Sequence, residues 1–71
     1  MSKLVKLAGW LPDWETGNQL PIYHDLVHNT YHVCGGFIDL HNVAALQEVQ
    51  VAGPFHTLGA VYQWRREKDD V

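Results

Sequence analysis

Three histidines at intervals of four residues are the feature of the sequence that most suggests chemistry. His24, His28 and His32 form the pattern H-x3-H-x3-H, which would place them in one stripe along a helix. Neighbours in such a stripe can share a metal ion, but the outer two would lie about 12 Å apart along the axis, too far for zinc–nitrogen bonds of about 2 Å. The three are therefore candidate metal ligands or a proton-sensitive contact face. The simpler interpretation is a solvated polar helix face, and we expect no metal site.

Residues suited to nucleophilic or acid–base catalysis are sparse. Cys34 is the one cysteine, so no intramolecular disulfide can form, and its position between Val33 and Gly35 is typical of a small buried side chain. The chain has neither a G-x-S-x-G nor a G-x-x-x-x-G-K motif. Asp25 and an adjacent histidine could form an acid–base pair, but one helix on a small sheet rarely encloses the pocket that catalysis needs. We expect no enzymatic activity and no cofactor.

The distribution of charge argues against nucleic acid as a partner. Between residues 7 and 64 the chain has no Lys or Arg, and only 18% of all residues are charged, below the usual share of about 25%. Phosphate binding needs clustered Lys and Arg. The one such cluster, at residues 65–68, is offset by the acidic residues around it. We expect binding to neither nucleic acid nor an anionic membrane.

Tryptophan and arginine are the residue types that dominate protein–protein interfaces. Trp10 and Trp64 could close a core between a sheet and a helix. Trp14 lies between Asp13 and Glu15 in a segment rich in Pro, Gly and Asn, so we expect an exposed docking anchor there. The residues predicted to bind a partner protein are Trp10, Trp14, Glu15, Trp64 and Arg65.

The positions of these residues depend on the elements that carry them. Residues 21–34 place apolar side chains largely on one side at a period of 3.6, with Pro21 suited to a first helical turn and Gly35 to the stop. This predicts an amphipathic helix. A strand over the same residues would mix polar and apolar side chains on one face, which we take as the weaker interpretation.

The remaining segments favour strands. We predict strands at 4–11, 37–41 and 48–51, and a further strand over 55–65, where the alternation of side chains is cleanest. A helix from Pro54 onward is the rival interpretation of that last segment. Residues 42–47 are open between a strand and a helical turn capped by Asn42.

These elements predict the α+β class: a single small domain over 1–71, with the helix at about 21–34 packed on a three- or four-stranded antiparallel sheet. Residues 66–71 are expected to fray. No apolar run approaches the roughly 18 residues of a membrane span, and the first residues lack the apolar stretch of a secretory signal. We expect a cytoplasmic protein.

These observations favour a small non-enzymatic protein-binding module that acts by surface occlusion. Its acidic, base-free surface would suit a partner with a basic surface, and strand addition at a sheet edge would allow self-association. Size alone suggests an inhibitor or adaptor, including those that viruses encode. The alternative is a metal- or pH-sensing module that uses the His24/His28/His32 helix face.

Overall fold

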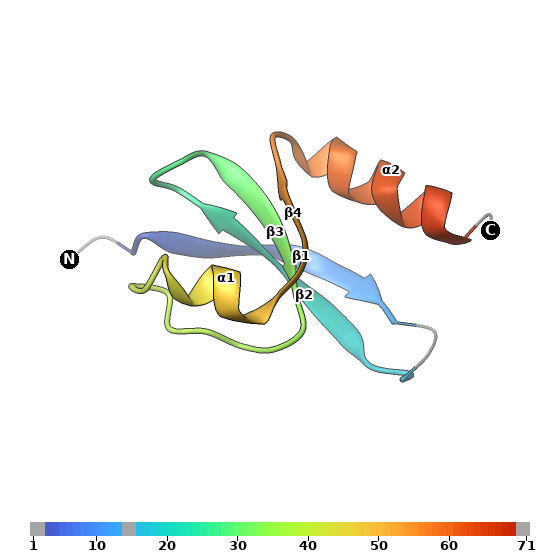
Figure 1. Ribbon diagram of the computed structural model, residues 1–71, viewed down its shortest axis with the longest axis horizontal. Helices are drawn as coiled ribbons and strands as arrows, with labels where there is room; N and C mark the ends of the chain where they lie inside the picture. The colour runs from blue at the N-terminus through green and yellow to red at the C-terminus, as the bar shows by residue number, and fades with distance from the viewer. Residues whose placement is uncertain (1–2, 14–15, 70–71) are drawn as a thin grey trace.

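The structure, a computed structural model, describes residues 3–13 and 16–69 of the chain (Figure 1). In this part the strands are β1 (Val5–Pro12), β2 (Gln19–Asp25), β3 (Thr30–Cys34) and β4 (Gln50–Phe55), and the helices are α1 (Ala45–Val49) and α2 (Leu58–Asp69). The four strands form one antiparallel sheet in the order β1-β2-β3-β4. The predicted α+β class is confirmed.

The helix predicted at 21–34 is wrong, because these residues form the β2–β3 hairpin. Ile22 pairs with Val33 and Tyr23 with His32, and Asn29 in the turn has a φ of 55°, a left-handed conformation that no helix interior contains. The misleading signal has a physical cause. Both faces of this hairpin are covered, so its strands carry apolar side chains on both sides and lose the alternation that marks a half-exposed strand.

The C-terminal segment is helical from Leu58, so the rival interpretation was closer than the strand predicted over 55–65, which is wrong; the helix does not start at Pro54, because Pro54 and Phe55 end β4. The Thr57 hydroxyl accepts a hydrogen bond from the Ala60 backbone N–H at the start of α2, as capping residues do. Val61 on this helix is buried. Residues 66–69 belong to α2, where the sequence suggested a frayed tail, and residues 70 and 71 lie outside the described part.

The segment before β4 also differs from expectation. Residues 37–41 are irregular, so the strand predicted there is wrong. The helical alternative for 42–47 is met in part, because residues 43 and 44 form a turn and α1 begins at Ala45. The Asn42 side chain accepts a hydrogen bond from the Ala45 N–H across the turn before α1, but the N-cap position of α1 is Ala44 and carries no side-chain cap, so the predicted capping role is not the one observed. The strand predicted at 48–51 is shifted: β4 begins at Gln50.

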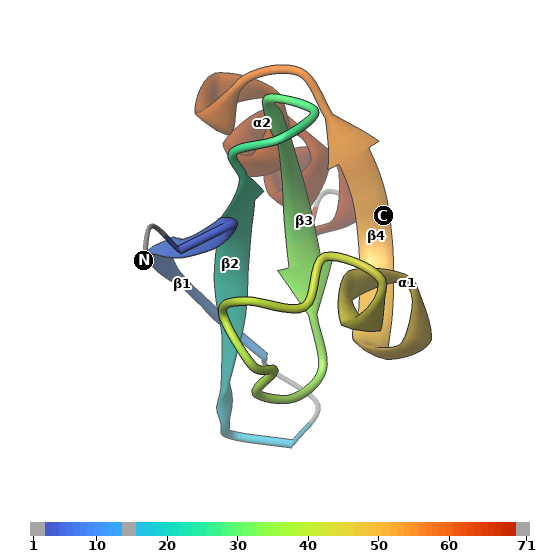
Figure 2. The same cartoon turned by 90° about the vertical axis from the view of Figure 1, so that its left-hand side faces the viewer.

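Two small cores lie on the two faces of the sheet. Figure 2 shows α1 on the near side and α2 on the far side. A β-bulge between Leu7 and Gly9 lets β1 contribute to both cores, because an extra residue reverses the direction of the side chains that follow. The core on the α1 side contains Val5, Tyr23, Cys34 and Leu46, and the core on the α2 side contains Leu11, Ile22, Val33 and Val61. No helix in the described part of the chain has the length and apolar character needed to cross a membrane.

Candidate functional site

The three spaced histidines do not share a face, so the helix face assumed for metal or proton sensing does not exist. His24 lies on the α2 side of the sheet, stacked on Tyr31 with ring centroids 4.2 Å apart. His32 lies on the opposite side, since its cross-strand partner Tyr23 belongs to the other core. Within residues 3–13 and 16–69, no group of three or more His, Cys, Asp or Glu side chains could hold a metal ion.

Asp25, at the end of β2, organises the hairpin turn. One carboxylate oxygen accepts the backbone N–H groups of Val27 (2.9 Å) and His28 (3.1 Å), and the other lies 2.7 Å from Nδ1 of the His28 ring. Burial by itself would raise the pKa of Asp25, but the hydrogen bonds from His28 and Val27 outweigh it and hold the pKa below 3.8. Asp25 is therefore an ionised, acceptor-only group, and the His28 Nδ1 that faces it carries a hydrogen.

A second chain of hydrogen bonds runs from the hairpin to β4. The Gln50 amide nitrogen donates to the Gly53 carbonyl (2.8 Å), and the Gln50 amide oxygen faces Nδ1 of His32 at 2.6 Å. The other ring nitrogen of His32 lies 2.9 Å from the Thr30 hydroxyl. His32 is buried, so this chain of bonds satisfies both of its nitrogens and fixes the ring.

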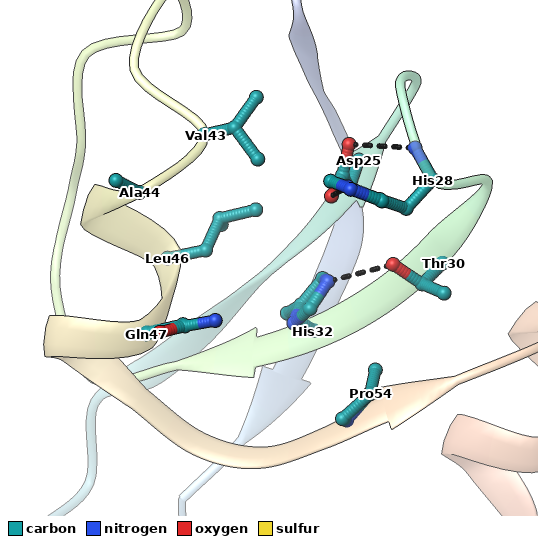
Figure 3. Close-up of a pocket in the computed structure, with 9 residues that line it drawn as sticks. All are labelled: Asp25, His28, Thr30, His32, Val43, Ala44, Leu46, Gln47 and Pro54. Atoms are coloured by element: carbon teal, nitrogen blue, oxygen red, sulfur yellow. Dashed lines mark hydrogen bonds and ion pairs between the residues drawn. The ribbon is translucent and has the colours of Figure 1, made fainter.

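These side chains border a pocket of about 600 Å³ between the hairpin and α1 (Figure 3). Asp25, His28, Thr30 and His32 form one side of it, and α1 with the residues before it forms the other. The sequence led us to expect that so small a fold would rarely enclose a pocket; this pocket is open to solvent on one side rather than enclosed. The pocket exists because residues 35–44 extend away from β3 and bring α1 back over the same sheet face.

Sequence reasoning found His28 and His32 but missed Thr30, Gln47 and Gln50. Thr30 and His32 are two residues apart on one strand, so a strand interpretation would have placed their side chains on the same face. Gln50 is 18 positions from His32, and nothing in the local pattern connects the two.

Cys34 is buried in the α1-side core, as the sequence suggested. Burial raises the pKa of its thiol to about 11. Because the thiolate is the nucleophilic form, a thiol with so high a pKa is unsuited to catalysis near neutral pH.

The residues predicted to bind a partner lie in different places. Trp64 packs beside the α2-side core, with its ring 6.0 Å from that of Phe55, and Arg65 next to it is buried. Trp10 pairs with Pro21, two residues from Tyr23, and so faces the other side of the sheet. Trp14 and Glu15 lie outside the described residues.

Trp10 and Phe37 form an exposed aromatic pair that the sequence did not indicate as a unit. Their rings meet edge to face with centroids 5.8 Å apart, and the residues are 41% and 75% exposed. The Tyr23 hydroxyl accepts a long hydrogen bond (3.4 Å) from the Ile38 backbone N–H, which ties the loop carrying Phe37 to the sheet. Leu7 is also exposed and lies on the same sheet face as Trp10, since it pairs with Tyr23.

No protein-family model, no curated protein and no solved structure matches this chain, so its function has to be argued from the geometry of its own residues.

Proposed function

We propose that this chain is a protein-binding module whose interface is centred on the aromatic pair, Trp10 and Phe37. The observation that carries the proposal is the exposure of two large aromatic side chains in contact with each other on one face of the sheet. Exposed apolar groups that adjoin one another mark interaction sites, whereas single exposed apolar residues are ordinary. Trp is moreover among the residues that most often dominate binding energy.

The position of the aromatic pair suits this role. Trp10 lies on β1, an edge strand of the sheet that pairs with β2; the Val5 N–H at the start of β1 donates to the Leu40 carbonyl (2.9 Å), so the edge that a partner strand would use is the later part of β1, around Trp10. A partner strand could pair with the other side of β1 while its side chains cover Trp10, Phe37 and the adjacent Leu7. Backbone pairing would supply affinity and the aromatic pair specificity, as in other cases of strand addition.

A second copy of the chain is the partner that this arrangement specifies most directly. An edge strand can pair with its own copy in antiparallel orientation, and the two aromatic pairs would then lie in one two-fold symmetric interface. A protein with a basic surface is the other partner that the charge distribution favours. In either case the module would act by covering a surface of its partner, as an inhibitor or adaptor does.

The test compares the wild type with the double variant Trp10→Ala/Phe37→Ala. Val51→Ala is the matched control, because the exposure of Val51 (51%) lies between those of Trp10 and Phe37, but Val51 is on β4, the opposite edge strand. Light scattering from micromolar to millimolar concentration should show a dimer for the wild type and for the control, and a monomer for the double variant. Affinity capture with the same three baits examines other partners. A monomeric wild type that captures the same proteins as the double variant would refute the proposal.

A further inference from the structure

The pocket between the hairpin and α1 has one polar and one apolar wall. The hairpin wall carries Asp25, His28, Thr30 and His32, whereas Val43, Leu46 and Pro54 supply apolar surface around the rest (Figure 3). Its volume of about 600 Å³ is in the range of pockets that hold small molecules. The directions of the hydrogen bonds in the polar wall determine which ligands suit it.

Thr30 presents an acceptor to the pocket. Because the Gln50 amide nitrogen donates to the Gly53 carbonyl, the Gln50 oxygen faces His32, and the Nδ1 of His32 must carry the hydrogen between them. In the uncharged ring Nε2 is then an acceptor, and the Thr30 hydroxyl donates its one hydrogen there. The lone pairs of the Thr30 oxygen are what remains for a ligand.

The hairpin turn, with Asp25 and His28, also presents hydrogen-bond acceptors to the pocket. The ionised Asp25 can only accept hydrogen bonds, so His28 donates to it through Nδ1. The uncharged His28 ring therefore has an acceptor, Nε2, left to offer. Among the described residues that line the pocket, none is Lys or Arg. The wall is thus rich in acceptors and carries the negative charge of Asp25, with no fixed cation lining the pocket to balance it.

We propose that this pocket binds a protonated organic amine with an apolar body. The ammonium group donates hydrogen bonds to the Thr30 oxygen and to Nε2 of His28, next to Asp25. The apolar body packs against Val43, Leu46 and Pro54. A carboxylate or phosphate is rejected, because it would meet acceptors and a carboxylate where it needs donors and positive charge. The site is independent of the aromatic pair, so its test does not depend on the proposed protein partner.

The experiment is a titration of the full chain at pH 8, followed by the backbone amide signals in NMR. The probes are phenethylamine, 2-phenylethanol and phenylacetate, which share an aromatic body and differ in the polar head. Phenethylamine should produce saturable shifts at residues 28–32 and 43–47, 2-phenylethanol weaker shifts at the same residues, and phenylacetate none. Equal effects of amine and carboxylate, or shifts confined to residues outside the pocket, would overturn the proposal.

Two variants test the mechanism of selection. Thr30→Val keeps the β-branched shape but removes the acceptor, and should weaken phenethylamine binding about tenfold, the effect of one hydrogen bond to a charged group. Gln47→Lys places a cation at the exposed rim formed by α1 without touching the hairpin, so it should weaken the amine and admit phenylacetate. Gln63→Lys is the control, because it adds the same charge on α2, which packs on the other face. Unchanged selectivity in Gln47→Lys would overturn the proposal even if Thr30→Val failed to fold.

Discussion

Replacing Asp25 by Asn should destabilise the fold substantially, although the side chain keeps its shape. Asn can still accept the two backbone N–H groups of the turn, but without the negative charge, and its NH2 group cannot accept the hydrogen of the His28 ring. Hydrogen bonds to a charged group contribute about 1 kcal/mol more than neutral ones. The bond to His28 counts for less, since the His28 side chain is 67% exposed while that of Asp25 is 4% exposed. Together these losses amount to about 2 kcal/mol.

The loss should depend on pH in a defined direction. The pKa of Asp25 is lowered in the folded chain, so the carboxylate binds a proton less readily there than in the unfolded chain. Its contribution to stability is fully present above the unfolded pKa and is lost as the pH falls through the lower folded pKa. The difference in free energy of unfolding between wild type and Asp25→Asn should therefore be constant above about pH 5 and shrink in more acidic buffer.

Urea unfolding followed by circular dichroism at several pH values measures this difference. At neutral pH, a loss of about 2 kcal/mol corresponds to a fall in melting temperature of about 8–16 °C for a domain of this size. Asp39→Asn is the control, because Asp39 also accepts a backbone N–H two residues ahead, that of His41, but at the surface. If Asp25→Asn cost no more than Asp39→Asn, or if its cost did not change in acid, the assignment of Asp25 as an ionised organiser of the turn would be wrong.

Three further substitutions or reactions probe the packing. Leu46→Ala should cost about 2–5 kcal/mol in urea unfolding, because Leu46 is 1% exposed and is the buried residue of α1, whereas Val51→Ala should cost less than about 0.5 kcal/mol. Gly53→Ala should lower the free energy of unfolding by about 1–3 kcal/mol. Gly53 has a φ of 127°, and a Cβ there would lie 3.1 Å from the Tyr31 carbonyl oxygen. An unchanged urea midpoint would contradict this prediction. Cys34 should react with a thiol reagent at pH 8 only in step with urea unfolding, since the thiol is buried and its pKa is raised to about 11; rapid reaction in native buffer would refute this.

The fold class could be predicted from the sequence because it depends on coarse features. Two-layer packing follows from a mixture of short apolar segments and turn residues, and it does not require each element to be assigned correctly. The strand predicted at 4–11 agrees with β1, which runs from Val5 to Pro12, to within one residue at each end. Apolar side chains in residues 55–65 fit both the strand period of 2 and the helix period of 3.6. Thr57, a capping residue and thus a local signal for the start of a helix, could have decided in favour of the helix.

The candidate site could be predicted only in part, because its geometry depends on the register of the hairpin. With residues 21–34 taken as a helix, His28 and His32 appeared to share a stripe with His24. In the hairpin, His24 faces one core and His32 the other. The contribution of Gln50 depends on β4 lying beside β3, a long-range pairing that no local pattern encodes.

One residue distinguishes the hairpin from the helix by experiment. Asn29 has a φ of 55°, and its side-chain oxygen contacts the His24 ring at 2.9 Å. Both Asn29→Gly and Asn29→Ala lose that contact, so their difference reports the backbone alone. In the turn, the left-handed conformation destabilises Ala by about 1–2 kcal/mol and does not destabilise Gly. In a helix interior, Ala would instead be favoured over Gly by about 1 kcal/mol.

We therefore expect Asn29→Gly to unfold at higher urea concentration than Asn29→Ala. Gly59 supplies the internal reference, because it lies in α2 and a Cβ there would meet nothing closer than the Thr57 hydroxyl at 3.9 Å. Gly59→Ala should stabilise the chain, so the preference between Gly and Ala should have opposite signs at the two positions. If Ala were preferred at both, residues 21–34 would be behaving as a helix, and the pocket, which depends on the hairpin, would not exist.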